Sequence, residues 1–399
     1  MSRNWLQRVA ITAAITALGV TGCESADDTA TKVETPPPTQ PGETSSSSTT
    51  GDPVADSKAA VEIAYAGTHR EPPTKGPKAT ADKTVWVIPC ADIIESCGWT
   101  AERAVEAGTA IGWDVTQQDG GLATEKQAEK INSAVAAGVD GIVLIGIDCG
   151  KVSTPLAAAK EAGIETVAFY GYDCNDDDEE GGEQLFSNVV NFGPQFKRYS
   201  DVARAFARVK ADYAIAQTDG KAVVLNIDIT DYLVMKYINE GFNAGLEACT
   251  TCEVAGTVSG LQTDLLSGAI KDKLVSELQS NPDINVLHVP IDPLFQFAVE
   301  GALATVNRDD ILVVGGDGLP SAIDYIRSGV SDAEVAFPHE WTAWASIDTM
   351  NRLFAGDDEY ADTGIGWTLI DADHNLPASG GFTPPIDFKA AFKKVWGVE

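Results

Sequence analysis

The chain has 399 residues and a formal net charge of −31, from 59 acidic and 28 basic side chains. A surface this acidic excludes nucleic acid as a partner, because binding phosphates requires their neutralisation by Lys and Arg. A chain of this length is longer than one compact core usually holds, so two lobes are expected.

The first 23 residues have the architecture of an export signal that ends at a cysteine. Two arginines precede a mostly apolar run over 9–20, which is too short for a bilayer span of about 20 residues. Two small residues then stand before Cys23. This arrangement resembles the bacterial lipoprotein signal and predicts a signal peptide over 1–22 and lipid attachment at Cys23. An ordinary secretory signal with a chance cysteine at the cut is the alternative.

The segment after Cys23 is rich in Ser, Thr and Pro and contains hardly any large apolar residue. Such a segment cannot bury enough surface to offset its chain entropy. We therefore predict a disordered stalk over 23–57, followed by an N-terminal extension over 58–82. No other stretch of the sequence is long and apolar enough to add a second membrane anchor.

From residue 84 strands and helices alternate. The continuous β-branched runs indicate strands that are covered on both faces, and therefore a parallel, doubly wound sheet. Each early helix stops at a glycine, which is the usual residue after a helix C-terminus. The expected strands of this first series are 85–89, 113–117, 141–147 and 166–170, and its helices are 100–111, 123–137 and 153–162.

A second α/β series follows the acidic segment 173–184. Its expected helices are 195–216, 232–247, 264–280, 294–305, 320–328 and 340–354, and its strands are 222–227, 253–259, 285–289, 311–315, 334–337 and 366–370. The fold class is therefore α/β, with two doubly wound parallel-sheet lobes joined by several crossings. The N-lobe is expected over 83–190 and 338–366, and the C-lobe over 191–337 and 367–399.

The acidic segment 173–184 was compared with a calcium-binding loop. Asp173, Asn175 and Asp177 have the right spacing, but Asp178 stands where the sharp turn needs Gly and Gln184 where the bidentate Glu is needed. We therefore predict no metal site, and interpret the segment as a solvated charge run. A calcium site of another loop type is the alternative.

Six cysteines follow Cys23, and export permits disulfides among them. Cysteines at the carboxyl ends of neighbouring parallel strands lie close enough to form a disulfide, and so do two cysteines that flank a short loop. A redox centre at the last pair is the alternative, but that pair follows a helix C-terminus, where no dipole lowers a thiol pKa. The predicted disulfides are Cys90–Cys97, Cys149–Cys174 and Cys249–Cys252.

The ordered series of segments is similar to a known family, the type 1 periplasmic solute-binding proteins of ABC transporters, in their ribose- and galactose-binding branch. The similarity covers roughly 83–399 and rests on AAGVDGIVLIGID (136–148), KEAGIETVAF (160–169), INEGFNAGLEA (238–248), ILVVGGDGLPSAIDYIRSG (311–329) and EWTAWASIDTMNRLFAG (340–356). The resemblance implies two lobes that close on a small ligand, and no catalysis. No catalytic residue and no cofactor are therefore expected, and no motif of a serine hydrolase, a zinc protease or a phosphate loop is present in the sequence.

Candidate ligand-binding residues lie where strands end, because ligands of open α/β sheets sit at the carboxyl ends of the strands. Asp92 and Trp99 follow the first strand. The resemblance implies that Asp317 is the ligand-binding aspartate, that Asp292 stands at an Asn-Asp turn, and that Lys236 replaces an arginine in the cleft. It also places Tyr170 and Tyr172 where the family carries an Asp-Arg pair, and His339 and Trp341 at a crossing between lobes. Aromatic faces and carboxylates of this kind suit a sugar or polyol.

These observations predict a lipid-anchored, monomeric, extracytoplasmic protein that binds a sugar or polyol and delivers it to an ABC permease. In a cell with an outer membrane it would be periplasmic. Two alternatives remain open: a ligand-sensing partner of a membrane receptor, and a binder of a nucleoside or another aromatic-bearing compound.

Overall fold

Two separate β-sheets organise the computed structural model, which describes residues 51–176, 182–357 and 362–398. The first sheet has the strand order β2-β1-β3-β4-β5, and all its neighbours are parallel. Its strands are β1 (Thr84–Pro89), β2 (Asp114–Gln117), β3 (Gly141–Ile145), β4 (Glu165–Phe169) and β5 (Asn188–Val189). Strand β5 was not among the strands predicted from the sequence.

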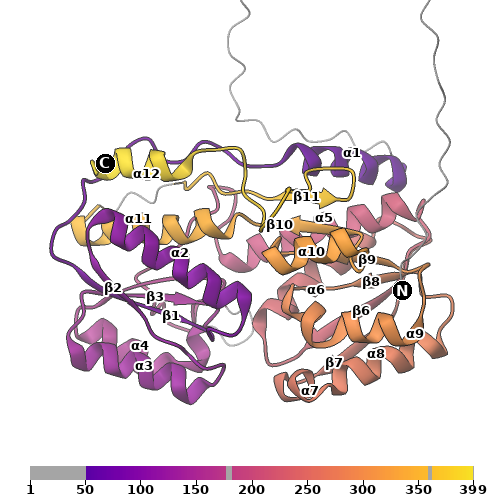
Figure 1. Ribbon diagram of the computed structural model, residues 1–399, viewed down its shortest axis with the longest axis horizontal. Helices are drawn as coiled ribbons and strands as arrows, with labels where there is room; N and C mark the ends of the chain where they lie inside the picture. Colours follow the sequence, from indigo (N-terminus) through magenta and orange to yellow (C-terminus); the bar gives the residue numbers. More distant parts are fainter. Residues whose placement is uncertain (1–50, 177–181, 358–361, 399) are drawn as a thin grey trace, which may run out of the picture. The chain divides into compact units, whose positions relative to one another are not determined.

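Helices cover both faces of the first sheet, as continuous apolar strands require (Figure 1). The helices are α2 (Glu95–Ile111), α3 (Thr124–Ala137) and α4 (Ser153–Glu161), with α11 (His339–Ala355) returning from later in the chain. Along β3, Leu144 packs in the core with α3 and α4, while the next residue, Ile145, packs with α2 and α11 on the opposite face. A short 3-10 turn, η1 (Cys149–Lys151), precedes α4. The helix predicted over 100–111 in fact begins at Glu95.

The second sheet has the order β11-β10-β9-β8-β6-β7, and only its edge strand β11 is antiparallel. Its strands are β6 (Val223–Ile229), β7 (Glu253–Gly260), β8 (Val286–His288), β9 (Leu312–Gly315), β10 (Ala333–Ala336) and β11 (Thr368–Asp371). Two parallel sheets with helices on both faces confirm the predicted fold class.

The helices of the second lobe follow the predicted order, with two breaks. The segment 264–280 forms two helices because Gly268 adopts the left-handed conformation, with φ +84°. The segment 294–305 begins as a π-turn, η2 (Phe295–Val299), before α9. The helices are α5 (Tyr199–Gln217), α6 (Leu233–Leu246), α7 (Gln262–Ser267), α8 (Ala269–Ser280), α9 (Glu300–Val306) and α10 (Pro320–Ser328).

Two terminal helices correct the predicted domain boundaries. Helix α1 (Pro53–Ala66) begins inside the range 23–57 that was predicted as a disordered stalk, and it packs on α5 and β11. Asp52 starts it by accepting hydrogen bonds from two backbone N–H groups, and buried Val61 and Ala64 fix its inner face. The rest of the predicted stalk, with Cys23 and the signal peptide, lies outside the described residues.

The second correction concerns helix α12 (Phe388–Trp396), which the sequence analysis assigned to the C-lobe within 367–399. It packs on α2 and α11 instead and therefore belongs to the N-lobe. Trp396 stacks on Trp344 of α11, and Phe388 stacks on Trp341 of the same helix. The apolar face of a short helix decides its location here, and chain order does not.

All three predicted disulfides, Cys90–Cys97, Cys149–Cys174 and Cys249–Cys252, are formed. The last pair bridges the turn after α6, and the burial of Cys249 favours a structural role over the redox alternative. In the predicted charge run, Asp173 accepts backbone hydrogen bonds from Leu185 and Phe186, so it stabilises the loop. Asp177 and Asp178 lie outside the described residues.

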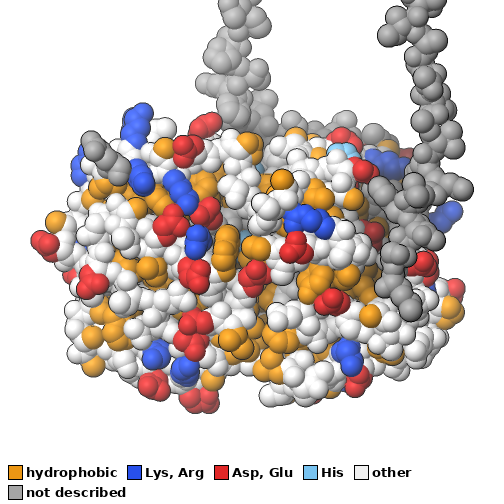
Figure 2. Space-filling model, in the orientation of Figure 1, with side chains coloured by type: hydrophobic (Ala, Val, Ile, Leu, Met, Phe, Trp, Pro, Cys, Tyr) orange, Lys and Arg blue, Asp and Glu red, His pale blue; other side chains and the backbone are white. Residues whose placement is uncertain are grey.

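The surface and the helix lengths bear on possible partners. On the face shown in Figure 2, acidic, basic and apolar side chains are interspersed, and the basic ones form no continuous patch among the described residues. Within the described ranges, no helix combines the length and the apolar character that crossing a membrane requires.

Candidate functional site

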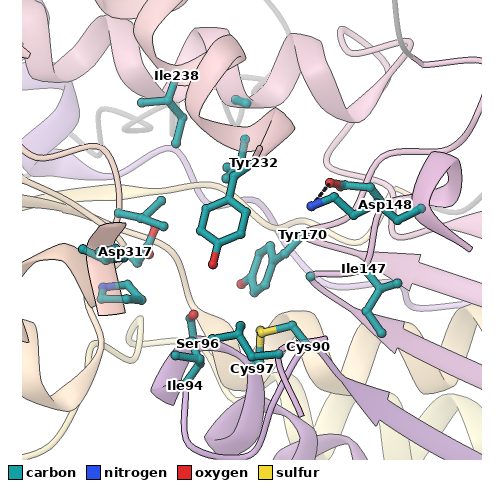
Figure 3. A pocket seen from close by; sticks show the side chains of 18 of the residues that line it. Cys90, Ile94, Ser96, Cys97, Ile147, Asp148, Tyr170, Tyr232, Ile238 and Asp317 are labelled. Atoms are coloured by element: carbon teal, nitrogen blue, oxygen red, sulfur yellow. Dashed lines mark ion pairs between the residues drawn. A yellow bond between two sulfur atoms is a disulfide. The ribbon is translucent and has the colours of Figure 1, made fainter. Parts of the chain in front are cut away.

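A cavity of about 150 Å³ is lined by residues from both lobes, at the carboxyl ends of the strands (Figure 3). This volume is enough for one six-membered ring. The N-lobe contributes the Cys90–Cys97 loop, the turn Gly146–Asp148 after β3 and Tyr170 after β4. The C-lobe contributes α5, the start of α6 and the loops after β6, β8 and β9. The cavity therefore lies where a parallel sheet offers ligand sites.

Three predicted site residues line this cavity: Tyr170, Asp317 and His339. Tyr170 has φ +57°, which is uncommon for a residue with a side chain. A Cβ at the following Gly171 would lie 2.3 Å from the Ile147 carbonyl oxygen. The chain thus turns sharply at Tyr170–Gly171, and this turn directs the Tyr170 ring into the cavity.

His339 is a buried wall residue of the same cavity. Its Nε2 lies 3.1 Å from the Asp317 carbonyl oxygen and its Nδ1 lies 3.4 Å from Thr100 Oγ1. Burial lowers the pKa of His339 to about 4, so the ring is neutral at physiological pH. Because both ring nitrogens have protein partners, His339 contributes an uncharged wall to the cavity.

Three predicted residues lie near the lobe surface or between helices and do not line the cavity. Asp92 is exposed and accepts a hydrogen bond of 2.6 Å from Gln117 Nε2. Trp99 packs edge-on against His339 and so stands behind the cavity wall. The Lys236 ammonium lies over the Tyr237 ring at 5.3 Å. Because α6 begins at Leu233, Lys236 lies on a different face of this helix from Val234 and Ile238, which line the cavity.

Three further predicted site residues are buried in the core and do not line the cavity. Tyr172 packs between Tyr199 and Tyr237. Trp341 stacks on Phe388 and has no exposed surface. Asp292 lies one layer beneath the cavity, where its backbone N–H donates to Asp317 Oδ2 at 3.2 Å. Position at a strand end placed these residues near the site, but it did not fix which way they point.

Several lining residues were not singled out from the sequence. Asp148 stands in the turn after β3 and pairs with Lys151 at 3.6 Å (Figure 3). The strand-end rule that selected Asp317 also applies to Asp148, so that signal was present. Lys151 in turn donates a hydrogen bond of 2.7 Å to the carbonyl oxygen of Asp231 in the other lobe. Ser96, Gln127 and Tyr232 also line the cavity, and nothing in their local sequence marks them.

Three hydroxyl groups converge on the cavity in Figure 3, from Ser96, Tyr170 and Tyr232. Ser96 stands on α2 and Tyr170 after β4, while Tyr232 immediately precedes α6 in the other lobe. Burial raises the pKa of both tyrosines far above the usual value, so both hydroxyls keep their protons. Each can donate or accept a hydrogen bond.

The two halves of the wall differ in polarity. The C-lobe half is mostly apolar, with Phe206, Val234, Ile238, Leu265, Phe297 and Phe337 among its members. The N-lobe half carries most of the polar groups, including Ser96, Gln127 and Asp148. Such a wall fits a ligand with one apolar face and several hydrogen-bonding groups on the other.

A family model described as a periplasmic binding protein domain matches residues 96–358. No relative was found among curated protein sequences. Among solved structures, an ABC transporter solute-binding protein from Burkholderia graminis in complex with D-arabinose is similar over 76% of this chain and 100% of that chain, with TM-score 0.62 and 17% identity.

Two further structures are similar at comparable levels. GanP, a glucose-galactose binding protein from Geobacillus stearothermophilus, has TM-score 0.61 and 17% identity, over 75% of this chain and 100% of that chain. A XylFII-LytSN complex has TM-score 0.58 and 18% identity, over 74% of this chain and 100% of that chain. At such identities the likeness shows the fold, and it agrees with the two-lobed architecture described above.

Proposed function

Because this chain belongs to the periplasmic binding protein family, we propose that it captures a sugar or polyol in the cavity and delivers it to an ABC permease. The family consists of extracytoplasmic substrate-binding proteins, which confirms the prediction that the chain is not an enzyme.

Hydroxyl groups from both lobes converge on one cavity that is large enough for a six-membered ring, and this observation supports a sugar or polyol as the ligand. Ser96, Tyr170 and Tyr232 can exchange hydrogen bonds with the hydroxyls of a sugar or polyol, and the apolar half can cover its C–H face. Groups from both lobes touching one ligand would favour the closed arrangement of the lobes. Structures of this fold with bound D-allose and myo-inositol support the same class.

A second candidate ligand is a compound with an aromatic ring, such as a nucleoside. The specific observation in its favour is the apolar C-lobe wall, in which Phe206, Phe297 and Phe337 can contact a flat ring. A sensing role beside a membrane receptor is a second candidate for the partner, because one structure with this fold is a XylFII-LytSN complex.

Thermal unfolding with a panel of compounds tests the ligand class. D-arabinose, D-galactose, D-allose, myo-inositol and adenosine are each added to the purified chain without its signal peptide. A compound present at 100 times its Kd stabilises the native state by about 2.7 kcal/mol, which raises the Tm by a few degrees. We expect this shift with at least one of the sugars or myo-inositol.

Tyr232→Phe provides the matched variant, because it removes one converging hydroxyl and keeps the ring. A lost hydrogen bond of about 1 kcal/mol should weaken the binding of that compound roughly fivefold. Ser267→Ala, on an exposed helix end, should change nothing. A shift with adenosine alone would replace the sugar with the aromatic candidate, and no shift with any compound would refute both.

We also propose that lipid at Cys23 confines the protein to the membrane that holds the permease. Confinement raises the effective concentration of a binding protein for its partner. Cys23→Ser should move the protein from the membrane fraction to the soluble extracytoplasmic fraction, as immunoblots of both fractions would show. Unchanged membrane association of the serine variant would contradict lipid attachment, because Cys23 is the proposed acceptor.

A further inference from the structure

The N-terminal extension passes from one lobe to the other. Helix α1 packs on α5 and β11 of the C-lobe, whereas the chain that follows it leads to β1 of the N-lobe (Figure 1). On the N-lobe, Arg352 Nη2 donates a hydrogen bond to the Lys75 carbonyl oxygen at 2.7 Å. Asn351 Oδ1 accepts one from the Thr80 backbone N–H at 2.9 Å. The extension is therefore anchored on both lobes, with residues 67–74 between the anchors.

Residues 67–70 run along a segment that joins the two lobes, and we call these four residues the hinge strap. The segment, 362–367, leads from α11 of the N-lobe to β11 of the C-lobe. The Thr68 backbone N–H donates to the Trp367 carbonyl oxygen at 3.0 Å, and the Trp367 backbone N–H donates to Thr68 Oγ1 at 3.0 Å. The hinge strap therefore pairs with this crossing much as two neighbouring strands pair.

The ring of His69 extends this pairing by one more step. The Gly366 backbone N–H donates to His69 Nδ1 at 3.1 Å, and His69 Nε2 lies 3.1 Å from Thr368 Oγ1. Because Nδ1 accepts, the ring is neutral with its proton on Nε2. A Cβ at Gly366 would lie 2.4 Å from the Thr68 carbonyl carbon. Glycine at this position is therefore what lets the hinge strap approach the crossing so closely.

Arg70 joins the hinge strap to two crossings at once. Its Nη2 donates to the Phe192 carbonyl oxygen at 2.9 Å, in the crossing from β5 to α5. Its Nε donates to Asp362 Oδ2 at 3.0 Å, and its Nη2 to Asp362 Oδ1 at 2.7 Å, in the crossing from α11 to β11. Its backbone N–H donates to the Gly364 carbonyl oxygen at 2.8 Å. A planar guanidinium holds such partners in one fixed geometry.

The hinge strap is observed with the lobes closed around the cavity. Lys151 of the N-lobe donates to the Asp231 carbonyl oxygen of the C-lobe at 2.7 Å. Gln262 Nε2 of the C-lobe donates to the Leu122 carbonyl oxygen of the N-lobe at 2.9 Å. Both Lys151 and Leu122 line the cavity. The contacts of the hinge strap therefore match the closed arrangement of the lobes.

We propose that the hinge strap favours the closed lobes and that Arg70 is a positioning residue for ligand binding. Separating the lobes bends the crossings between them. Bending moves the Phe192 carbonyl oxygen and the Asp362 carboxylate out of their common contact with Arg70. The strap thus raises the share of closed protein before a ligand binds, and a larger share of the competent form raises the apparent affinity. This inference deepens the proposed function and rests on it in taking the cavity as the ligand site.

Distances between spin labels on the two lobes test the proposal in the ligand-free protein. The labels are attached at Glu129→Cys on α3 and Ser276→Cys on α8, both exposed positions, in the mature chain with Cys23→Ser. With the natural strap we expect a shorter and a longer distance. Arg70→Met should lower the ratio of the shorter to the longer distance at least threefold. A single longer distance with the natural strap, or an unchanged ratio in Arg70→Met, would overturn the proposal.

Lys83→Met is the matched control for the loss of a cation. Lys83 pairs with Asp140 at 2.9 Å, and this pair is partly exposed like that of Arg70 but lies within the N-lobe. The control should leave the ratio unchanged, and an equal effect of both variants would overturn the proposal. Gly366→Ala displaces the hinge strap by its added Cβ and should also lower the ratio. If Arg70→Met does not fold, the direction of the change in Gly366→Ala decides.

Titration of D-arabinose by calorimetry gives the functional arm. Its Kd should rise in Arg70→Met, by at most the factor by which the ratio of distances falls. Lys83→Met should bind like the wild-type protein. A lower Kd in Arg70→Met would show that the strap favours open lobes and would overturn the proposal. Failure of D-arabinose to bind would count against the proposed sugar ligand, and the distances in the ligand-free protein would still decide this inference.

Discussion

Replacing both Cys149 and Cys174 by serine is expected to lower the free energy of unfolding by between about 3 and 4 kcal/mol. The disulfide joins residues 25 apart in the sequence, so its loss releases a long loop in the unfolded chain. It also ties η1 to the chain after β4, where the Cys149 backbone N–H donates to the Tyr172 carbonyl oxygen at 2.8 Å. Urea unfolding followed by fluorescence measures the change.

The same substitution should weaken ligand binding, because the neighbours of both cysteines shape the cavity wall. Asp148 lines the cavity, and its carboxylate accepts from the backbone N–H of Tyr172 at 3.3 Å. The matched control is the double serine variant of Cys249 and Cys252, whose disulfide joins residues only three apart. Neither of these cysteines lines the cavity. This control variant should lower the free energy of unfolding by about 2 kcal/mol or less and leave ligand binding unchanged. Equal losses in the two variants would contradict the loop-length argument.

The fold could be predicted because its signals are local and repeated. Buried parallel strands form continuous β-branched runs, and each early helix ends at a glycine such as Gly112 or Gly138 with positive φ. The Cys149–Cys174 disulfide followed from element order, since strand neighbours in a βαβ unit are also neighbours in space. The other two followed from the short loop or turn that each pair of cysteines brackets. The terminal helices α1 and α12 were missed although local signals were present: Asp52 and Asp387 cap them, and the buried residues of α12 recur at helical spacing. Their docking sites depend on long-range contacts, which the sequence does not show.

The candidate site could be predicted only to the level of strand ends. That rule found Asp317 and Tyr170, because Tyr170 directly follows β4 and Asp317 stands two residues after the end of β9. The family resemblance implied that Lys236 lies in the cleft, but the phase of helix α6 turns Val234 and Ile238 toward the cavity instead. The strand-end rule also could not show that Asp292 lies a layer deeper with Lys210 and Glu334, because three separate elements bring those charges together. Side-chain direction and tertiary proximity are the missing information.

The buried ion pair between Arg352 and Asp348 of α11 leads to the second prediction of large effect. It concerns residues 67–82, the part of the N-terminal extension that follows α1. Arg352 Nε donates to Asp348 Oδ2 at 2.8 Å, and the two side chains are 7% and 2% exposed. Arg352 Nη2 also donates to the Lys75 carbonyl oxygen at 2.7 Å, so it binds the extension to the N-lobe. Trp396 of α12 donates its Nε1–H to the other Asp348 oxygen at 2.8 Å. Both terminal segments therefore meet at this pair.

Arg352→Met is expected to lower the free energy of unfolding by about 3–5 kcal/mol, because it leaves the Asp348 carboxylate buried without its cation. Urea unfolding measures the loss, and limited proteolysis of the native protein should show new cleavage in the released extension near Lys75. The double variant Asp348→Asn with Arg352→Met removes the unpaired charge and keeps an oxygen for Trp396, so it should recover at least about 1 kcal/mol of the loss. A double variant less stable than Arg352→Met would refute the buried-charge argument. The loss would then be assigned to the hydrogen bond that Arg352 donates to the extension, and cleavage near Lys75 would be equal in the two variants.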